Sequence, residues 1–283
     1  MSESRFNAIV ILDAIPEKHL NTARILKSEL RDIADYVAVG LQVRYVRIET
    51  YDDLKLGLNK TLDEINNNGL KPWIHLEGHG LSDQCGFKFA GGTSCSWVQL
   101  KEILIPLNIA LSLNLVLILA TCFGGYFASA IETTDRAPVL ALIGPPREVK
   151  TREVERVFPV FYRTFFESQS LSEALKALDT GASFGPYFKT TAERFFYAAW
   201  TAYKKNPCTE DQIEKRVWKV WIENVIIKKK RSPLVSIDQQ KRLLRNPELE
   251  SKVFEKCRDH YFMYDIDKAN RERFPVTYNK AES

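Results

Sequence analysis

Short, uninterrupted apolar runs alternate with longer amphipathic segments over the first two-thirds of this 283-residue chain. Such runs are typical of parallel strands buried on both faces, and the segments between them have helical spacing. We expect strands at 6–12, 42–48, 72–76, 114–120 and 138–143, with a small hairpin at 86–92. We expect helices at 17–39, 52–67, 96–111, 153–169 and 170–178. This order predicts an α/β fold with a mostly parallel central sheet flanked by helices.

The pattern changes after about residue 185, where aromatic side chains lie among lysines and arginines and strand signals become few. We therefore expect one domain over 1–185 and a mainly helical C-terminal extension over 186–283. A solvated helix end explains the basic cluster Lys228–Arg231 more simply than a nucleic-acid patch does. Aromatic side chains interleaved with basic residues can also stack on the bases of single-stranded nucleic acid. Without a recognised module, a nucleic-acid partner remains the less favoured alternative.

Composition narrows the class of protein without assigning a function. The chain has 45% hydrophobic residues, 27% charged residues and a net charge of +4, which is the balance of an ordinary globular protein. Its five dispersed cysteines form no C-x-x-C pair, so we expect a reducing, cytoplasmic location. The stretch Ile103–Ile131 lacks charge, but Pro106 and Gly124–Gly125 interrupt it. We expect a helix, a turn and a buried strand there rather than a membrane span.

Two candidate catalytic side chains follow expected buried strands. His79 follows the strand at 72–76 after two residues, and Cys122 follows the strand at 114–120 after one. In an open parallel sheet, chemistry gathers at the carboxyl ends of the strands. If these two strands are neighbours, the imidazole and the thiol lie over the same edge. The imidazole can then take the thiol proton and later protonate a leaving amine.

Glycines beside both residues suit the rest of such a site. We expect the N–H groups of Gly80 and Cys122 to form an oxyanion hole, because glycine lets a substrate approach the backbone closely. We also expect a helix that opens at Gly124–Gly125 to favour the thiolate through its dipole. The sequence thus predicts Cys122 as nucleophile and His79 as acid/base.

The motifs HLEGHG and LATCFGG, each at the end of a strand, resemble those of the caspase-like (clan CD) cysteine peptidases. His79 and Cys122 are 43 positions apart, and the resemblance covers 6–185. It is strongest to CHAT-type and related prokaryotic caspase-like proteins. It implies a caspase-hemoglobinase fold and a cysteine endopeptidase that cleaves protein or peptide substrates through a His–Cys dyad, with no metal or cofactor. It also implies regulated activity in a defence (antiviral) or cell-death pathway. We expect the C-terminal helices either to couple to a regulatory protein or to block the cleft.

Departures from the caspase pattern bear on specificity and control. Ala120 stands where caspases carry Gln, so specificity for Asp at P1 is not expected. The connection at 133–137 is too short for a cleavable linker, so we expect single-chain activity. Asp13 ends the first strand and is a candidate S1 residue that would favour Lys or Arg at P1, although a turn or cap role is commoner. Glu77 is a candidate to orient His79 or to face substrate.

Several of the histidines and cysteines also have interpretations other than catalysis. His75, Glu77 and His79 alternate along the chain, with Cys85 nearby, as zinc ligands can. However, His75 falls in the middle of an expected buried strand, so we expect no metal. His19 and His260, together with the cysteines at 95, 208 and 257, are expected to be structural. The main rival function is a catalytically silent scaffold or binding protein with the same fold.

Overall fold

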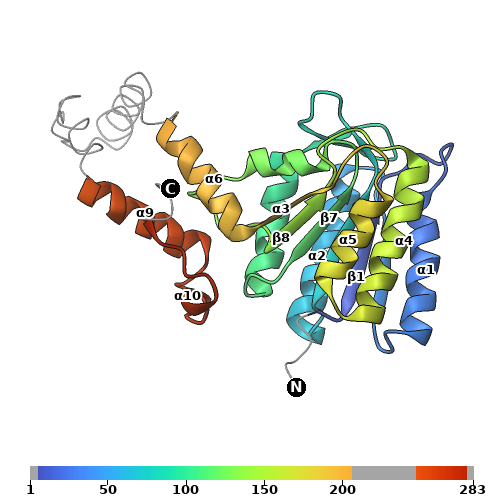
Figure 1. Cartoon of the computed structure of the whole chain (residues 1–283), viewed down its shortest axis with the longest axis horizontal. Coiled ribbons are helices and arrows are strands. Elements are labelled where there is room, and N and C mark those ends of the chain that lie inside the picture. The colour runs from blue at the N-terminus through green and yellow to red at the C-terminus, as the bar shows by residue number, and fades with distance from the viewer. Residues whose placement is uncertain (1–5, 206–246, 279–283) are drawn as a thin grey trace. The chain divides into compact units, whose positions relative to one another are not determined.

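The computed structural model describes residues 6–205 and 247–278 (Figure 1). The chain separates into two compact units, each described by itself. The first unit comprises 1–131 and 137–192, and the second comprises 132–136 and 193–283. The basic cluster Lys228–Arg231 and Cys208 lie outside the described residues.

A six-stranded sheet forms the centre of the first unit. Its strands, in spatial order, are β2 (Gln42–Arg47), β1 (Ala8–Asp13), β3 (Pro72–Glu77), β7 (Val116–Ala120), β8 (Ala141–Gly144) and β9 (Phe188–Thr191). The first five are parallel and β9 is antiparallel. Asp13 pairs with Glu77 and Glu77 with Ala120, so β1, β3 and β7 end level with one another. The predicted mostly parallel sheet is confirmed, whereas the caspase-hemoglobinase fold stays a prediction.

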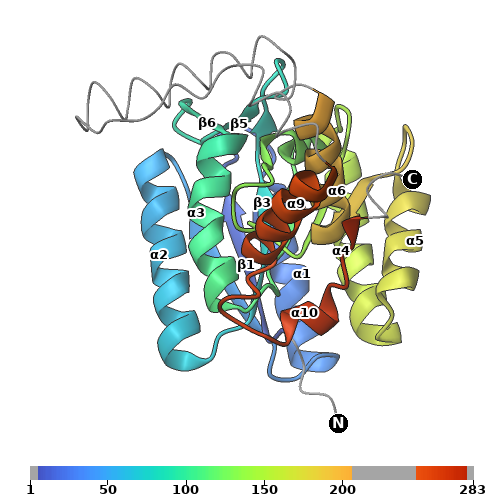
Figure 2. The same cartoon turned by 90° about the vertical axis from the view of Figure 1, so that its left-hand side faces the viewer.

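Helices cover both faces of this sheet (Figure 2). One face carries α1 (Thr22–Tyr36), α4 (Thr151–Ser168) and α5 (Leu171–Gly181), and the other carries α2 (Tyr51–Asn68) and α3 (Trp97–Ala110). The apolar side chains of α1 recur at helical spacing and enter the core shared with α4, at Ala23, Leu26, Leu30 and Ile33. Burial of this stripe, at about 1.5–3 kcal/mol for each large side chain, holds α1 against the sheet.

A second, three-stranded antiparallel sheet begins where β3 ends. It consists of β4 (His79–Gly80), β5 (Gly86–Lys88) and β6 (Ser94–Ser96). The hairpin that we predicted over 86–92 is therefore present, with its second strand further along the chain. After β7 the chain forms a short 3₁₀ helix, η1 (Gly124–Ala130).

Two elements differ from the sequence-based expectation. The helix expected from Glu17 starts at Thr22, because the side chain of Asn21 caps it by accepting the Arg24 N–H. Residues 14–21 therefore form a loop after β1. We did not predict β9, which lies within the extension expected to be mostly helical and adds an edge strand to the sheet.

The uncharged stretch at 103–131 folds as the second half of α3, then β7 and η1. Pro106 lies inside α3, and the left-handed residues Ser112 and Leu113 turn the chain toward β7. Within residues 6–205 and 247–278, no helix combines the length and the apolar character needed to cross a bilayer.

The described part of the second unit is helical, with α6 (Ala192–Lys205), α9 (Pro247–Tyr261) and α10 (Asn270–Arg273). Its core is aromatic and includes Phe196, Trp200 and Phe254. Arg136 donates two hydrogen bonds to Asp265, at 2.8 and 2.6 Å. This bidentate pair lowers the pKa of Asp265 to about 2.

Candidate active site

The two predicted catalytic residues leave the same edge of the central sheet. β3 and β7 are parallel neighbours, and Glu77 pairs with Ala120. His79 and Cys122 each lie two residues beyond this pair. Both side chains line one cavity of about 50 Å³. The thiol and the imidazole, which are far apart in sequence, are thus brought to a shared site.

Gly80 packs directly against the backbone of Cys122. A Cβ atom at Gly80 would lie 1.9 Å from the Cys122 carbonyl oxygen, so only glycine fits there. The Leu81 N–H donates to Gly86 O at 2.9 Å, which makes Gly80 and its cross-strand partner Phe87 a non-hydrogen-bonded pair. The Gly80 N–H is therefore not used by the β4–β5 ladder.

The loop that follows β8 reaches back to the nucleophile. Sγ of Cys122 lies 3.4 Å from the Val149 nitrogen, which donates to it, and 3.7 Å from the Val149 carbonyl oxygen. The next residue, Phe123, has a left-handed backbone with φ of +60°. Its N–H donates to Arg147 O at 3.0 Å. A non-glycine residue in this conformation is strained, and the contacts with the loop hold it in place.

The predicted helix dipole at Cys122 is not supported by the geometry. η1 is a short 3₁₀ helix, and its first N–H groups are already bonded to carbonyl oxygens. Gly124 N–H donates to Thr121 O and Gly125 N–H to Pro145 O, at 3.0 and 2.9 Å. Few free donors remain at this helix end to stabilise a negative sulfur.

An ion pair fixes the loop at residues 145–150. Nη2 of Arg147 lies 2.8 Å from Oε1 of Glu153, and it also donates to Gly185 O at 2.8 Å. Burial raises the pKa of Glu153, but hydrogen bonds from Arg147, the Ser183 N–H and Tyr187 outweigh it, so the pKa is lowered overall. The loop beside the thiol is therefore anchored by a carboxylate that stays ionised.

His79 contacts a second histidine. Its Nε2 atom lies 2.7 Å from Nδ1 of His19, and the two rings meet edge to face. Burial, His19 and Lys88, in decreasing order, lower the pKa of His79. In the part of the chain that the structure describes, no hydrogen bond joins His79 to Cys122. The lowered pKa favours the neutral imidazole of His79, and its hydrogen-bonded nitrogen, Nε2, faces His19.

We expected His19 to be structural, and the structure instead places it in the candidate site. It lies in the loop after β1, whose carboxyl end is level with that of β3. A polar residue shortly after a third parallel strand was the sequence signal that could have identified it.

No family model and no curated protein sequence matches this chain.

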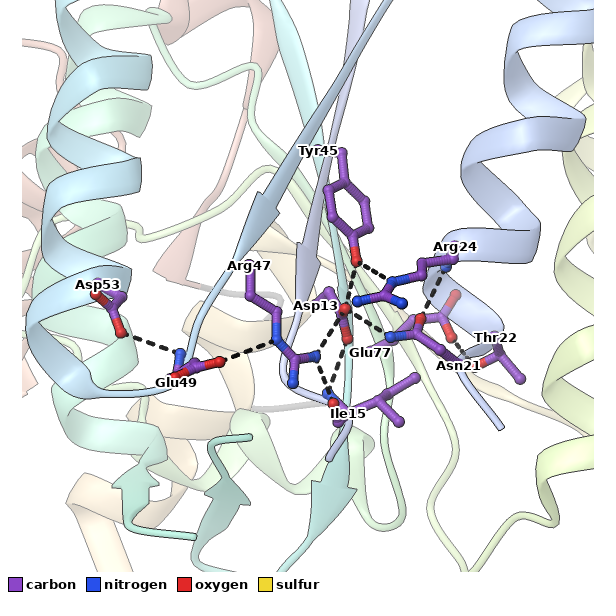
Figure 3. Close-up of polar contacts among 10 residues, drawn as sticks. All are labelled: Asp13, Ile15, Asn21, Thr22, Arg24, Tyr45, Arg47, Glu49, Asp53 and Glu77. Atoms are coloured by element: carbon purple, nitrogen blue, oxygen red, sulfur yellow. Dashed lines mark hydrogen bonds and ion pairs between the residues drawn. The ribbon is translucent and has the colours of Figure 1, made fainter. Parts of the chain in front are cut away.

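Asp13, the predicted S1 candidate, is fully buried and has partners on both oxygens (Figure 3). Oδ1 accepts the Ile15 N–H at 2.8 Å, and Oδ2 accepts from Asn21 and Arg47, each at 2.8 Å, and from the Tyr45 hydroxyl. The carboxylate thus ties the β1 turn to β2 and to the start of α1. These bonds assign it the turn-and-cap role, and Asp13 does not line the cavity with Cys122.

Glu77 does not contact His79. Its side chain is 1% exposed and accepts a hydrogen bond from the Thr22 hydroxyl (Figure 3). Oε1 lies 3.2 Å from Nε2 of His75, whose Nδ1 lies 3.1 Å from the Tyr162 hydroxyl. Burial and the charge of Glu77 raise the pKa of Tyr162 well above its usual value. This buried chain connects the sheet to α1 and α4.

The contacts of His75, Glu77 and His79 also test the alternative that these residues are zinc ligands. His75 and Glu77 are bonded to each other in the core, while His79 faces His19. Within the described ranges, no three His, Cys, Asp or Glu side chains are placed to hold one metal ion. The chemistry that the site offers is therefore a thiol, two imidazoles in contact with each other and nearby backbone N–H groups.

Proposed function

We propose that this protein is a cysteine endopeptidase of the caspase-like type, with Cys122 as nucleophile and His79 as acid/base. The observation that supports this most directly is the shared cavity at the ends of β3 and β7, lined by both side chains. The close packing of Gly80 on Cys122 adds support, because it brings two candidate oxyanion donors next to each other.

The proposed reaction has two steps. Sγ of Cys122 attacks the scissile carbonyl carbon and its proton passes to His79, while the carbonyl π electrons move to the oxygen, which accepts from the Gly80 and Cys122 N–H groups. The C–N bond then breaks, and His79 gives its proton to the leaving amine. In the second step water attacks the thioester, its proton passes through His79 to the departing sulfur, and the acid product leaves.

The size of the cavity supports regulated rather than constant activity. Its volume of about 50 Å³ is well below the roughly 300–1,000 Å³ of ordinary ligand pockets. Val149, which contacts the sulfur, and His19 both border it. These two residues leave little room for a peptide beside the thiol, so we propose that a partner or signal opens the site. Protein or peptide substrates and a cytoplasmic location belong to the same proposal.

The small cavity and the missing Cys122–His79 hydrogen bond also favour one rival, a catalytically silent protein of the same fold. Alkylation by iodoacetamide, mapped by mass spectrometry on the full-length chain, separates the two. We expect Cys122 to react faster than the exposed Cys85, and His79→Ala to slow it at least about tenfold. Cys95 is an internal reference, because burial raises the pKa of its thiol to about 12.

Equal, slow labelling of Cys122 and Cys85, unchanged by His79→Ala, would favour the silent scaffold. A fluorogenic peptide library, with Cys122→Ala as the inactive control, then tests peptidase activity itself. We expect no preference for Asp at P1, since Ala120 replaces the glutamine of caspases.

A further inference from the structure

The contact between His19 and His79 sets the tautomer of the proposed base. A distance of 2.7 Å between two ring nitrogens requires one proton between them, so one ring donates and the other accepts. If His19 donates, the proton of neutral His79 is on Nδ1 and that nitrogen cannot take another. If His79 donates through Nε2, its Nδ1 carries a lone pair.

Only the second arrangement is compatible with the proposed chemistry. His79 Nε2 is held by His19, so Nδ1 is the nitrogen left to take the thiol proton of Cys122. Once it has done so, both nitrogens of His79 carry protons, and Nε2–H still needs an acceptor at the same distance. The neutral ring of His19, protonated on its Nε2, supplies that acceptor.

We propose that His19 is a positioning residue whose Nδ1 accepts the Nε2–H of His79 and so keeps the opposite nitrogen of His79 free for the Cys122 proton. This inference rests on the proposed function. Both histidines border the cavity that contains Cys122, and His19 reaches it from a different strand end than His79 does. A neighbour that fixes the tautomer of a catalytic histidine is a recurring requirement of such sites.

The same geometry makes the site sensitive to acid. If both rings carried protons on both nitrogens, N–H would face N–H across this 2.7 Å contact and the hydrogen bond that fixes the tautomer of His79 would be lost. The other charged or titratable groups around the pair are Lys88, which pairs with His79 across β4 and β5, the Cys122 thiol, and Glu17 and Lys18 beside His19. Burial, His19 and Lys88 all lower the pKa of His79, which extends the active range toward lower pH.

The test compares three substitutions of His19 in the full-length chain. In His19→Asn, Oδ1 takes the place of Nδ1 as an acceptor that does not titrate. In His19→Gln the amide is one bond further out, and in His19→Ala the acceptor is lost. The exposed neighbour Lys18→Ala is the matched control, and urea unfolding checks that each variant is folded. The readout is the rate of Cys122 alkylation by iodoacetamide from about pH 5 to about pH 9, with His79→Ala alongside.

We expect the plateau rate to fall about 10- to 100-fold in His19→Ala and His19→Gln, and to recover in His19→Asn. The acid limb of the pH–rate profile for Cys122 alkylation should move to higher pH in all three His19 variants. The reason is that His79 loses the imidazole that lowers its pKa. Lys18→Ala should match the wild type.

Three results would overturn the inference. In the first, His19→Ala keeps the wild-type plateau rate and acid limb of Cys122 alkylation, while His79→Ala is alkylated slowly. His19 then has no such role, although the proposed function stands. If all three variants slow equally with an unmoved limb, the role is only structural. If His79→Ala matches the wild type, the proposed function fails, and the role of His19 fails with it.

Discussion

The packing of Gly80 on Cys122 gives the sharpest prediction. In Gly80→Ala, the new Cβ atom would lie 1.9 Å from the Cys122 carbonyl oxygen, whereas Cβ atoms essentially never come closer than 3.0 Å to such an atom. Because both partners are backbone, no side-chain rotation relieves the clash. Strand β4 with His79 and the segment of Cys122 must therefore separate by about 1 Å, a displacement that costs a catalytic site on the order of 100-fold in rate.

Two measurements follow this substitution. Overpacking of this kind lowers the free energy of unfolding by about 1–3 kcal/mol, which urea denaturation resolves. The rate of Cys122 alkylation by iodoacetamide should fall at least about tenfold, since His79 no longer lies at the right distance to take the thiol proton. Peptide hydrolysis, once a substrate is known, should fall further.

Gly91→Ala is the matched control, because its Cβ atom would lie 2.6 Å from the Glu49 carbonyl oxygen, outside the cavity of Cys122. It should lose stability without slowing the labelling of Cys122. If Gly80→Ala instead labels at the wild-type rate and unfolds at the wild-type urea concentration, the close contact of the two turns is wrong. If both variants slow the labelling equally, the effect is one of general destabilisation.

Two further predictions concern stability. Asp13→Asn should lower the free energy of unfolding by roughly 2–4 kcal/mol in urea, because it removes the buried carboxylate beside Arg47 and leaves only the exposed Glu49, 3.6 Å away, as charge partner; a loss under about 0.5 kcal/mol would contradict this. Glu153→Gln should be less stable than the wild type above about pH 4.5. That difference should vanish as the pH falls through the lowered pKa of Glu153 in urea titrations, whereas a constant difference would contradict its pairing with Arg147.

The elements of the fold with strong apolar patterns were predictable. β7 is a run of aliphatic residues covered on both sides, and its end fixes the position of Cys122. β9 was missed because its sequence FKTT contains no apolar run; it is a short antiparallel edge strand, and only one of its four positions is buried. Tertiary pairing with β8 decides its conformation, and a local pattern does not carry that information.

The candidate site was predictable in part. The sequence predicts that His79 and Cys122 each follow a strand, but only the strand order makes β3 and β7 neighbours. Asp13 was open to two interpretations because its main partner, Arg47, comes from β2 and depends on the register of β1 with β2. His19 was missed because we extended the helical pattern of α1 back to Glu17, over residues that form the loop instead.

The chain passes between its two units three times, after residues 131, 136 and 192. The excursion at 132–136 belongs with the second unit, where Arg136 binds Asp265. A single cleavage at residue 185 would therefore not release two self-sufficient modules, since it would separate this excursion from the residues that hold it. Residues 132–136 of the second unit thus lie in the connection between η1 and β8, which begins about ten residues along the chain after Cys122.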